Sequence, residues 1–417
     1  MSHDCDAFQP PRELLTYAEA LSALSDAVRP VEGTETVSLF DASGRILAED
    51  LRACWTVPPP DNSAVDGYAV RSADLAAAGA CLPVGGRVPA GQVLGRAIAP
   101  GEVVRIFTGA PVPDGVDAVI PQENCRVDEG GVWLPLVPSG ANIRRRGEDF
   151  HDGEVVLPAG RRLQPQDIGL AAAAGHARLT VCRRPRIAYF ATGDEVREPG
   201  EPLGPGAIVN SNAYIVDALL RRLGCEPRYL GIIRDRFELV RDALAGAAAA
   251  GVDAILTTGG VSTGEEDHVK AAVEARGALN FWRIAIRPGR PLAFGRIGAV
   301  PFIGLPGNPV AATVTFLMFA RPLLRILSGA RPRPEAAQWV PADFSVVKKA
   351  GRREWLRGSL RAGPDGLFRA VSFPNQGSGV LTSMVASSGL IVLPEELTTV
   401  SPGDLVEFLP FSALLEG

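Results

Sequence analysis

The spacing of hydrophobic and polar residues divides this 417-residue chain into segments with different predicted structures. Residues 12–30 place apolar side chains at helical spacing and predict a helix. Residues 53–157 alternate short apolar runs with glycine and proline, which is typical of β-strands joined by turns. Residues 335–417 carry short strand patterns around a Pro364-Asp365-Gly366 turn and predict a small β domain.

Strand and helix patterns alternate between these β-rich parts, in residues 185–334. Such alternation predicts an α/β domain whose strands are parallel and whose connections cross the sheet as helices. The predicted strands are 186–191, 229–233 and 253–257, and the predicted helices are 214–223, 237–250 and one that starts at Val310, after Asn308 as N-cap and Pro309 as first helical residue.

Composition and charge exclude several classes of protein. The net charge is −5, so nothing favours binding to nucleic acid through bulk charge. The amino-terminal residues lack the basic and apolar regions of a secretory signal. The longest apolar run, 310–320, is far shorter than the roughly 20 residues of a membrane span. The six cysteines contain no CxxC pair and there are only four histidines, so we expect a cytoplasmic protein with free thiols and no histidine-rich metal site.

The loop PPPDNSAVDGYAV, residues 58–70, is the most informative local segment. Its three prolines stiffen the backbone, and Asp61, Asn62 and Ser63 are turn-forming residues. Asp66-Gly67 then forms a second turn before an apolar run. A rigid loop that presents two carboxylates and an amide suits a ligand site, but an ordinary surface turn has the same composition.

Polar and glycine residues follow each predicted strand of the α/β segment. Because ligands bind beyond the carboxyl ends of parallel strands, we expect these residues to meet at one edge. Glycines let backbone N–H groups approach a phosphate, and carboxylates beside a phosphate are compatible mainly through a bridging Mg²⁺. The alternative is that the acids only cap helices. The residues concerned are Thr192, Gly193, Asp194, Glu195, Asp235, Gly259, Gly260, Val261, Ser262, Gly264 and Asp267.

The segment GVSTG, residues 260–264, also matches the nucleophile elbow of hydrolases. That mechanism requires a histidine well downstream of the serine. The only later histidine, His268, follows Ser262 by six residues, so a hydrolase triad is excluded. The sequence also lacks a P-loop and a dinucleotide-binding glycine fingerprint.

Arginines form two further groups, at positions 283, 287 and 290 and at positions 144–146. Guanidinium groups bind phosphate and other oxyanions with paired hydrogen bonds. A run of arginines such as 144–146 is also common on a solvated surface, and the sequence leaves both interpretations open.

The combined motifs resemble those of the molybdopterin molybdenumtransferases, a family that includes the C-terminal domain of gephyrin. The resemblance runs from about residue 12 to the C-terminus. Its motifs occur in the family's order, and TTGGVSTG alone is the least specific because other molybdopterin-related proteins share it. They are DNSAVDGYAV, IFTGAPVPDGVDAVI, NIRRRGED, TGDE, LGIIRD, TTGGVSTGEEDH, FWRIAIRPGRP and GLPGNPV.

The resemblance implies an elongated α/β multidomain subunit with four parts. A linking domain would combine residues 1–52, including the first helix, with the return segment 158–184. A β-rich insertion domain would occupy 53–157, an α/β molybdopterin-binding domain with a central parallel sheet 185–334, and a small C-terminal β-barrel 335–417. The resemblance also implies a homodimer whose active site joins the α/β domain of one subunit to the insertion of the other.

The activity implied by the resemblance converts adenylylated molybdopterin and molybdate into molybdenum cofactor and AMP, with Mg²⁺. Implied protein partners are the adenylyltransferase and molybdoenzyme chaperones. The implied catalytic residues are Asp66, Thr108, Asp149, Glu195, Asp235 and Asp267, with Asp267 and Glu195 as metal ligands. The implied substrate-binding residues are Thr192, Gly193, Asp194, Gly259, Gly260, Val261, Ser262, Gly264, Arg287, Pro288, Pro306, Gly307, Asn308, Pro309, Arg357 and Ser378.

The chain departs from the family pattern at a few positions. Arg283, Arg287 and Arg290 stand where many members have lysine. Arginine keeps the positive charge, but it cannot donate or accept a proton near neutral pH as a lysine can. Ala311 replaces a serine hydroxyl. Two other functions stay open: an adenylyltransferase that uses the α/β domain alone, and a non-catalytic scaffold of the gephyrin kind. Molybdate and tungstate, both tetrahedral oxyanions of similar size, fit the same residues.

Overall fold

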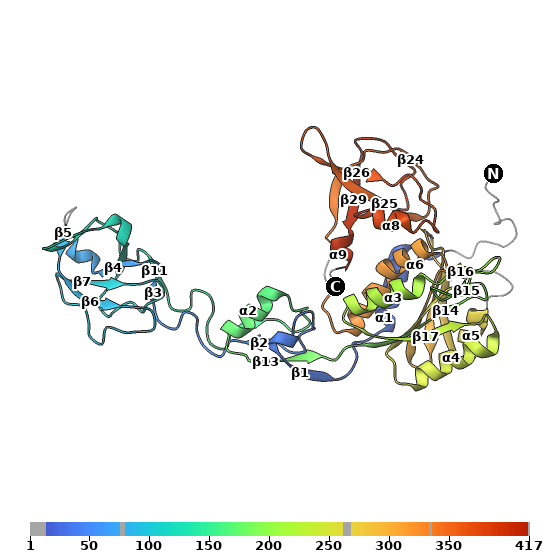
Figure 1. Ribbon diagram of the computed structural model, residues 1–417, viewed down its shortest axis with the longest axis horizontal. Helices are drawn as coiled ribbons and strands as arrows, with labels where there is room; N and C mark the ends of the chain where they lie inside the picture. The colour runs from blue at the N-terminus through green and yellow to red at the C-terminus, as the bar shows by residue number, and fades with distance from the viewer. Residues whose placement is uncertain (1–13, 76–79, 262–267, 333–335, 416–417) are drawn as a thin grey trace.

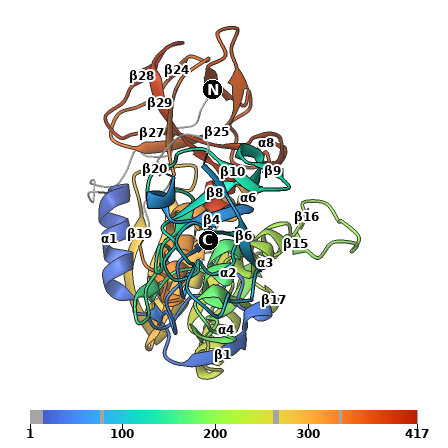
Figure 2. The ribbon, with the colours of Figure 1, turned by 90° about the vertical axis from the view of Figure 1, so that its left-hand side faces the viewer.

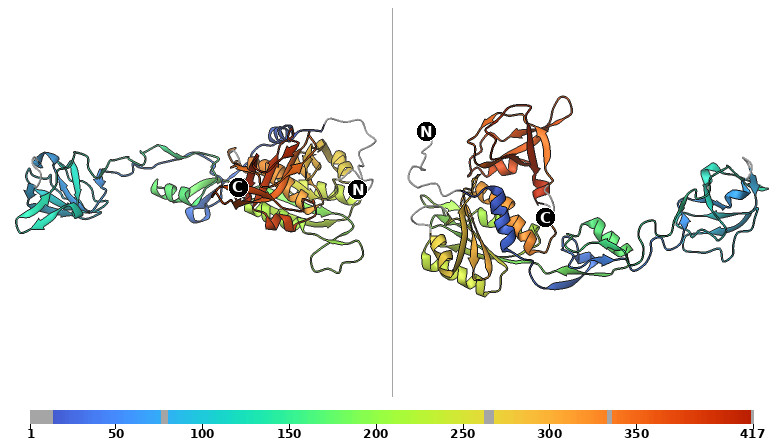
Figure 3. Two further views of the ribbon diagram at one scale, coloured as in Figure 1. Left: turned by 90° about the horizontal axis from the view of Figure 1, so that it is seen from above. Right: turned by 180° about the vertical axis from the view of Figure 1, so that it is seen from behind.

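The computed structural model describes residues 14–75, 80–261, 268–332 and 336–415. The subunit is elongated, with the β-rich insertion at one end and a narrow linking segment in the middle (Figure 1). The α/β domain and the C-terminal β domain lie together at the other end, as the views from above and behind also show (Figure 3). This arrangement agrees with the elongated multidomain subunit expected from the sequence.

The α/β domain is built on a six-stranded sheet with the order β17-β14-β18-β22-β21-β19. The first four strands are parallel, as predicted, but β21 and β19 are antiparallel to their neighbours. Only Gly298 and Ala299 separate β21 from β22, and so short a connection can join only antiparallel strands. The strands are β14 (Arg186–Thr192), β17 (Glu226–Ile233), β18 (Ala254–Thr258), β19 (Gly277–Arg283), β21 (Pro291–Ile297) and β22 (Val300–Leu305).

Helices cover both faces of this sheet (Figure 1). One face carries α3 (Asn212–Arg222) and α6 (Pro309–Thr315), whose apolar residues share a core with β14 and β22. The opposite face carries α4 (Phe237–Ala249) and α5 (His268–Arg276), which share a second core with Phe190 and Phe302.

The N-terminal helix α1 (Tyr17–Ala27) begins with a capping box between Thr16 and Glu19. It was expected to accompany the linking segment. Instead, its buried residues Ala20 and Leu24 pack into the α/β core, because this face supplies the large apolar surface that an amphipathic helix needs.

The helix that contains the apolar run 310–320 continues beyond it. A π-helical turn, η4 (Phe316–Ala320), joins α6 to α7 (Arg321–Leu327), and together they form 19 helical residues. Pro322 lacks the N–H that a regular α-helix requires, and the wider π turn ahead of it lets the helix continue. By length and composition this helix could cross a membrane, but 83% of its apolar window is buried inside the protein, as in a core helix.

The linking segment contains two small antiparallel pairs and helix α2 (Pro165–Ala173). Residues before 53 pair with residues after 154, so the chain leaves toward the insertion and returns alongside itself. The pairs are β1 (Thr34–Ser38) with β13 (Arg178–Cys182) and β2 (Leu51–Arg52) with β12 (Val155–Leu157). Leu47, Leu163 and Val181 lie in the buried core between them.

The insertion domain is β-rich, as predicted. Its main sheet has the order β6-β7-β4-β8, and a second sheet has the order β5-β10-β9. A third pair, β3 with β11, fixes the start of the 58–70 loop. The strands are β3 (Asn62–Ser63), β4 (Gly67–Val70), β5 (Ala80–Leu82), β6 (Val84–Val88), β7 (Val103–Ile106), β8 (Ala118–Pro121), β9 (Arg126–Asp128), β10 (Gly131–Leu134) and β11 (Ile143–Arg144).

The C-terminal domain is also built from β-strands. Its sheet has the order β20-β25-β27-β29-β23, with β26 also paired to β25 and a separate β24–β28 pair. Strand β20 comes from the α/β segment, so this sheet crosses the domain junction. The strands are β20 (Ile286–Arg287), β23 (Gln338–Pro341), β24 (Val346–Val347), β25 (Arg353–Ala362), β26 (Phe368–Ser372), β27 (Gly389–Leu393), β28 (Thr399–Val400) and β29 (Leu405–Pro410).

Candidate functional site

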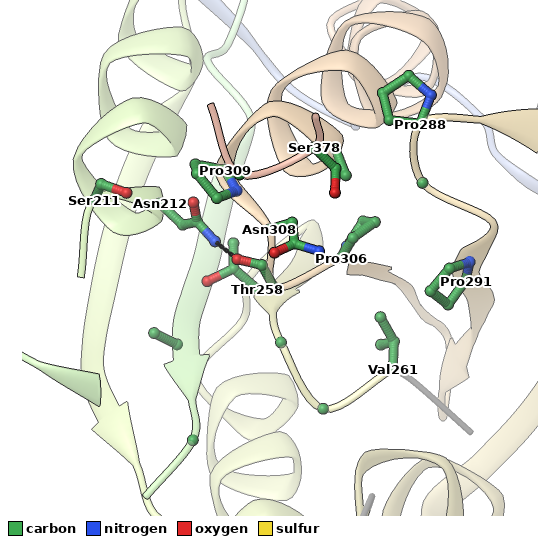
Figure 4. A pocket seen from close by; sticks show the side chains of 18 of the residues that line it. Ser211, Asn212, Thr258, Val261, Pro288, Pro291, Pro306, Asn308, Pro309 and Ser378 are labelled. Atoms are coloured by element: carbon green, nitrogen blue, oxygen red, sulfur yellow. Dashed lines mark hydrogen bonds between the residues drawn. The ribbon is translucent and has the colours of Figure 1, made fainter. Parts of the chain in front are cut away.

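A pocket of about 1250 Å³ lies beyond the carboxyl ends of β14, β17, β18 and β22 (Figure 4). It collects most of the substrate-binding residues expected from the sequence, although they come from six separate parts of the chain. The expected residues that line it are Thr192, Gly193, Glu195, Asp235, Gly259, Gly260, Val261, Arg287, Pro288, Pro306, Gly307, Asn308, Pro309 and Ser378.

Some expected residues are not part of this lining. Ser262, Gly264 and Asp267 lie outside the described residues, so the expected role of Asp267 as a metal ligand stays a prediction. Asp194 is exposed beside the pocket, and Arg357 lies behind its wall. Arg290 and Ala311 do line it.

The turn after β18 depends on glycine for its shape. Gly259 has a φ of +91°, and a Cβ added there would lie 2.5 Å from the Thr192 carbonyl oxygen. Any side chain would therefore push β18 away from β14. The Gly259 N–H donates to the Leu305 carbonyl oxygen at 3.0 Å, so it is not available to bind a ligand. The role of Gly259 is to let the turn pass close to the Thr192 backbone.

The loop Pro306 to Pro309 forms the adjacent wall. Asn308 and Pro309 occupy the N-cap and the first turn of α6, as predicted, although the Asn308 side chain makes no capping hydrogen bond. The Asn212 amide on α3 donates to the Gly307 carbonyl oxygen at 2.7 Å and thereby fixes the loop. Nothing in the local sequence points to the contact of Asn212 with residue 307.

Two carboxylates, Glu195 and Asp235, face the pocket. Asp235 is half-buried, and its Oδ1 atom has no hydrogen-bond partner among the described residues. Burial raises the pKa of Asp235; the negative charges of Asp194 and Glu195 add to this effect, and a hydrogen bond from the His268 backbone opposes it. The site therefore holds a carboxylate that would gain from a nearby cation.

Arginines line the opposite part of the pocket, where the α/β and C-terminal domains meet. Strand β20 pairs with β25 so that Arg287 lies beside Glu354. The Glu354 side chain is 1% exposed and pairs with Arg352 Nε at 2.7 Å and Arg287 Nη1 at 3.4 Å. Burial of a carboxylate between two cations fixes their positions at the pocket wall. Arg352 and Glu354 were not predicted, because the pairing that places them is long-range.

Arg357 supports the pocket from behind. It is 1% exposed, and its guanidinium donates to Ser383 Oγ and to the Gly377 carbonyl oxygen, both at 3.0 Å. Burial lowers the pKa of Arg357 to about 10, and the positive charge of Arg287 acts in the same direction. Arg357 thus shapes the loop that carries Ser378, and its guanidinium does not line the pocket itself.

The three expected residues of the insertion, Asp66, Thr108 and Asp149, belong to the domain that lies at the opposite end of the subunit from the α/β sheet (Figure 1). Asp66 Oδ1 accepts hydrogen bonds from Thr108 N at 2.8 Å and Thr108 Oγ1 at 2.7 Å, and these bonds lower the pKa of Asp66. Asp149 lines a separate hollow of about 450 Å³ together with Asn62 and Arg144.

The 58–70 loop combines both interpretations given above. Asp61 is held as in a structural turn, by Arg145 Nη1 at 2.6 Å and the Arg146 backbone N–H at 2.8 Å. Asp66 remains half-exposed at the surface. One chain does not bring the insertion residues together with Glu195 and Asp235.

Comparison with known protein families gives three matches along the chain. The MoeA N-terminal region (domain I and II) matches residues 15–175. A probable molybdopterin binding domain matches residues 188–326. The MoeA C-terminal region (domain IV) matches residues 340–411.

Curated relatives match nearly the full length. A molybdopterin molybdenumtransferase of Haemophilus influenzae is 39% identical and is aligned over 96% of this chain and 100% of its own. One from Nostoc is 36% identical over 89% of this chain and 87% of its own. Two crystal structures of the molybdopterin biosynthesis protein MoeA from Pyrococcus horikoshii superpose with TM-scores of 0.76 and 0.82, at 30% and 31% identity, over 96% and 95% of this chain and 99% and 100% of theirs.

Proposed function

Because the chain belongs to the molybdopterin molybdenumtransferase family, and is thus an enzyme of molybdenum cofactor biosynthesis, we propose that it inserts molybdenum from molybdate into adenylylated molybdopterin and releases AMP. The observation that carries this proposal is the pocket, where close-packed glycine turns and acids face arginines from the domain junction. Its volume of about 1250 Å³ exceeds that of a usual small-molecule site and suits a dinucleotide-sized substrate together with an oxyanion.

The residues that line the pocket have different proposed roles, according to their chemistry. The turn at Gly259 lets the nucleotide phosphates approach the sheet edge. Arg287 and Arg352 supply guanidinium groups for the molybdate oxygens, with the Ser378 hydroxyl beside them. Arg287 replaces a family lysine, and it serves here as a fixed positive charge that transfers no proton.

Mg²⁺ fits the acidic side of the pocket. Among the described residues, no group of three or more histidine, cysteine, aspartate or glutamate side chains is arranged to hold a metal. Mg²⁺ is commonly held by one or two carboxylates plus substrate phosphates, and Glu195 and Asp235, with its unpartnered Oδ1, provide such carboxylates. Asp267 would add a third. When bound, the ion would offset the negative charge that gathers at the phosphoanhydride.

The proposed reaction breaks one phosphoanhydride bond and forms two sulfur–molybdenum bonds. One molybdate oxygen leaves as water with the two thiol protons of the pterin dithiolate. One water is consumed at the phosphoanhydride, and AMP is the leaving group. The arginine wall binds the oxyanion during the exchange, and the acidic wall orients the anhydride for cleavage.

We propose a homodimer in which the insertion of one subunit completes the pocket of the other. The supporting observation is that the insertion domain, which contains Asp66 and Asp149, lies at one end of the elongated chain. The α/β domain, whose residues line the pocket, lies at the other end (Figure 1). Mixing Asp66→Asn and Glu195→Gln chains tests this. If subunits exchange freely, half of the dimers are mixed and carry one intact site, so about a quarter of wild-type activity should return. No recovery from a mixture in which two differently tagged chains co-purify as mixed dimers would contradict the shared site.

The function itself is tested by incubating the protein with adenylylated molybdopterin, Mg²⁺ and molybdate, and measuring AMP and active cofactor. Replacing molybdate by tungstate compares the two oxyanions. Consumption of ATP with unmodified molybdopterin would favour the adenylyltransferase alternative, and binding of a receptor peptide without AMP release would favour the scaffold. Unchanged turnover in Asp267→Asn would remove the role proposed for that carboxylate.

Three finer features complete the proposal. The C-terminal domain closes as a small barrel, supported by a bridge between Ala342 and Ala370 that links β23 to β26. The enzyme works in the cytoplasm, where the five described cysteines, all free, remain thiols. Its protein partners are the adenylyltransferase that makes its substrate and the chaperones that carry its product.

A further inference from the structure

One wall of the pocket is a projecting segment, residues 193–211, which we call the flap. It contains two short paired strands, β15 (Val196–Arg197) and β16 (Ile208–Val209), and stands out from the body of the subunit (Figure 2). Val196, Ile208 and Val209 line the pocket. The tip of the flap, residues 199–206, is exposed throughout, so packing against the body does not hold it.

A single carboxylate fastens the flap to the sheet and to α3. Glu198 Oε1 accepts a hydrogen bond from the Tyr229 hydroxyl of β17 at 2.6 Å. Glu198 Oε2 accepts one from the Tyr214 hydroxyl of α3 at 3.0 Å. Hydrogen bonds to a charged acceptor are roughly twice as strong as neutral ones, so this pair is the firmest attachment of the outgoing strand.

The returning strand of the flap ends on the same tyrosine. The Asn210 side-chain amide donates to the Tyr229 hydroxyl at 2.8 Å, and Asn210 Oδ1 accepts from the Ala213 backbone N–H at 3.2 Å. Both arms of the flap therefore meet at Tyr229. Burial and the bond to Glu198 raise the pKa of Tyr229, so its hydroxyl remains a donor in neutral solution.

The flap lies against one particular side of the pocket. Ser211 at its base, and Asn212 at the start of α3, face the Pro288 to Pro291 segment across the opening (Figure 4). The arginine wall is on the far side. Beside the carboxylate of Glu195, the flap presents the apolar side chains of Val196, Ile208 and Val209 to the pocket. An apolar wall offers nothing to a tetrahedral oxyanion but can pack against an organic ring.

We propose that Glu198 is a positioning residue that holds the flap in the geometry that binds the organic substrate. The proposal rests on the function given above, since that substrate is adenylylated molybdopterin. Without the two tyrosine bonds the flap samples other positions, and only the fraction of molecules with the flap in place binds tightly. Molybdate, on the arginine wall, is not affected.

The chain offers a matched control for this proposal. Tyr189 is stacked on Tyr229, with ring centroids 5.1 Å apart, and its hydroxyl also bonds a carboxylate, Asp217 Oδ1 at 2.9 Å. That bond joins β14 to α3 and does not involve the flap. Tyr189→Phe therefore removes the same chemical group from the same sheet, and Tyr229→Phe removes the one that holds the flap.

The experiment measures steady-state AMP release and, separately, trypsin cleavage after Arg197 in the intact dimer. In Glu198→Gln and Tyr229→Phe we expect the KM for adenylylated molybdopterin to rise about tenfold, with kcat and the KM for molybdate unchanged. The same two variants should be cut after Arg197 several times faster than wild type, and Tyr189→Phe should match wild type in both assays.

The outcomes distinguish failure of the positioning role of Glu198 from failure of the proposed molybdenumtransferase function. Faster cleavage with an unchanged KM would overturn the positioning role, as would equal changes in Tyr189→Phe and Tyr229→Phe. If wild-type protein releases no AMP, the proposed function fails. The cleavage rates still test whether Glu198 holds the flap. Equal cleavage rates in wild type and all three variants would overturn that role. Circular dichroism confirms that each variant is folded before either assay.

Discussion

Substituting alanine for Gly259 tests whether the close approach of β18 to β14 sets the shape of the pocket. Gly259 combines a φ of +91° with a Cβ position only 2.5 Å from the Thr192 carbonyl oxygen. Gly251 lies in the turn between α4 and β18 with a φ of +70°, but a Cβ added there would meet nothing within 4 Å. The two alanine variants therefore share the backbone strain and differ in the steric clash.

The structure gives the size of each effect. Alanine at positive φ costs about 1–2 kcal/mol, and Gly251→Ala should lose only this amount. Gly259→Ala has the same backbone strain and, in addition, a steric clash with the Thr192 carbonyl oxygen. A backbone oxygen cannot rotate away from the clash as a side chain could. Overpacking of this kind costs about 1–3 kcal/mol more, so the total is about 2–5 kcal/mol. For a domain of this size each kcal/mol corresponds to about 2–4 °C in Tm.

Calorimetry of the α/β transition and the KM for adenylylated molybdopterin are the two measurements. Gly259→Ala should lower the Tm by about 1.5 to 4 times as much as Gly251→Ala. It alone should raise the KM, because the displaced turn lines the pocket. Equal Tm losses would show that the clash is absorbed without cost. An unchanged KM in Gly259→Ala would refute the argument that this approach shapes the site.

Three other predictions concern charged groups: two at the site, and one at the amino ends of β14 and β18, on the opposite edge of the sheet. Glu354→Gln should raise the KM for molybdate about tenfold and leave that for adenylylated molybdopterin unchanged, because it loosens Arg287 and Arg352; equal changes in both values would contradict this. The raised pKa of Asp235 means that its ionisation opposes folding, so stability falls as pH rises through that pKa. Asp235→Asn should therefore have a higher Tm than wild type at pH 7 in Mg²⁺-free buffer and no advantage below 3.8, the ordinary pKa of an aspartate. Burial raises the pKa of Asp253, but the two hydrogen bonds from Arg183, both at 2.7 Å, help to lower it below its ordinary value. The stability that this ion pair contributes is therefore lost as pH falls. Arg183→Gln should lower the free energy of unfolding, measured in urea, by about 3 kcal/mol at pH 7 and by less at pH 3.

The sequence predicted the sheet edge of the site well, for a physical reason. Parallel strands end at the same edge, so residues that follow each strand, such as Thr192, Asp235 and Gly259, must meet there once the strands are recognised. The helix periodicity of α3 and α4 was strong enough to set their bounds within a few residues.

The arginine side could not be derived in the same way. Arg287 meets Glu354 through strands of only two paired residues, in segments far apart in the sequence, and no local pattern specifies that pairing. The antiparallel edge of the sheet was also missed, since β19 and β21 contain arginine, glycine and tryptophan that disguise strand alternation. Arg357 was expected at the oxyanion by resemblance, but its burial behind Gly377 depends on the whole C-terminal sheet.

The domain junction bears directly on which transferase this protein is. A nucleotide-transferring enzyme that used the α/β domain alone would need only the sheet edge, with its glycine turns and acids. Here Arg352 and residues 376–379 of the C-terminal domain form part of the same pocket, and β20 ties Arg287 into that domain's sheet. The buried Glu354 then sets the arginines from the C-terminal side. Arginines from both sides of a domain junction suit the proposed reaction, in which a second anion binds separately from the nucleotide, and molybdate is the anion that a molybdenumtransferase reaction requires.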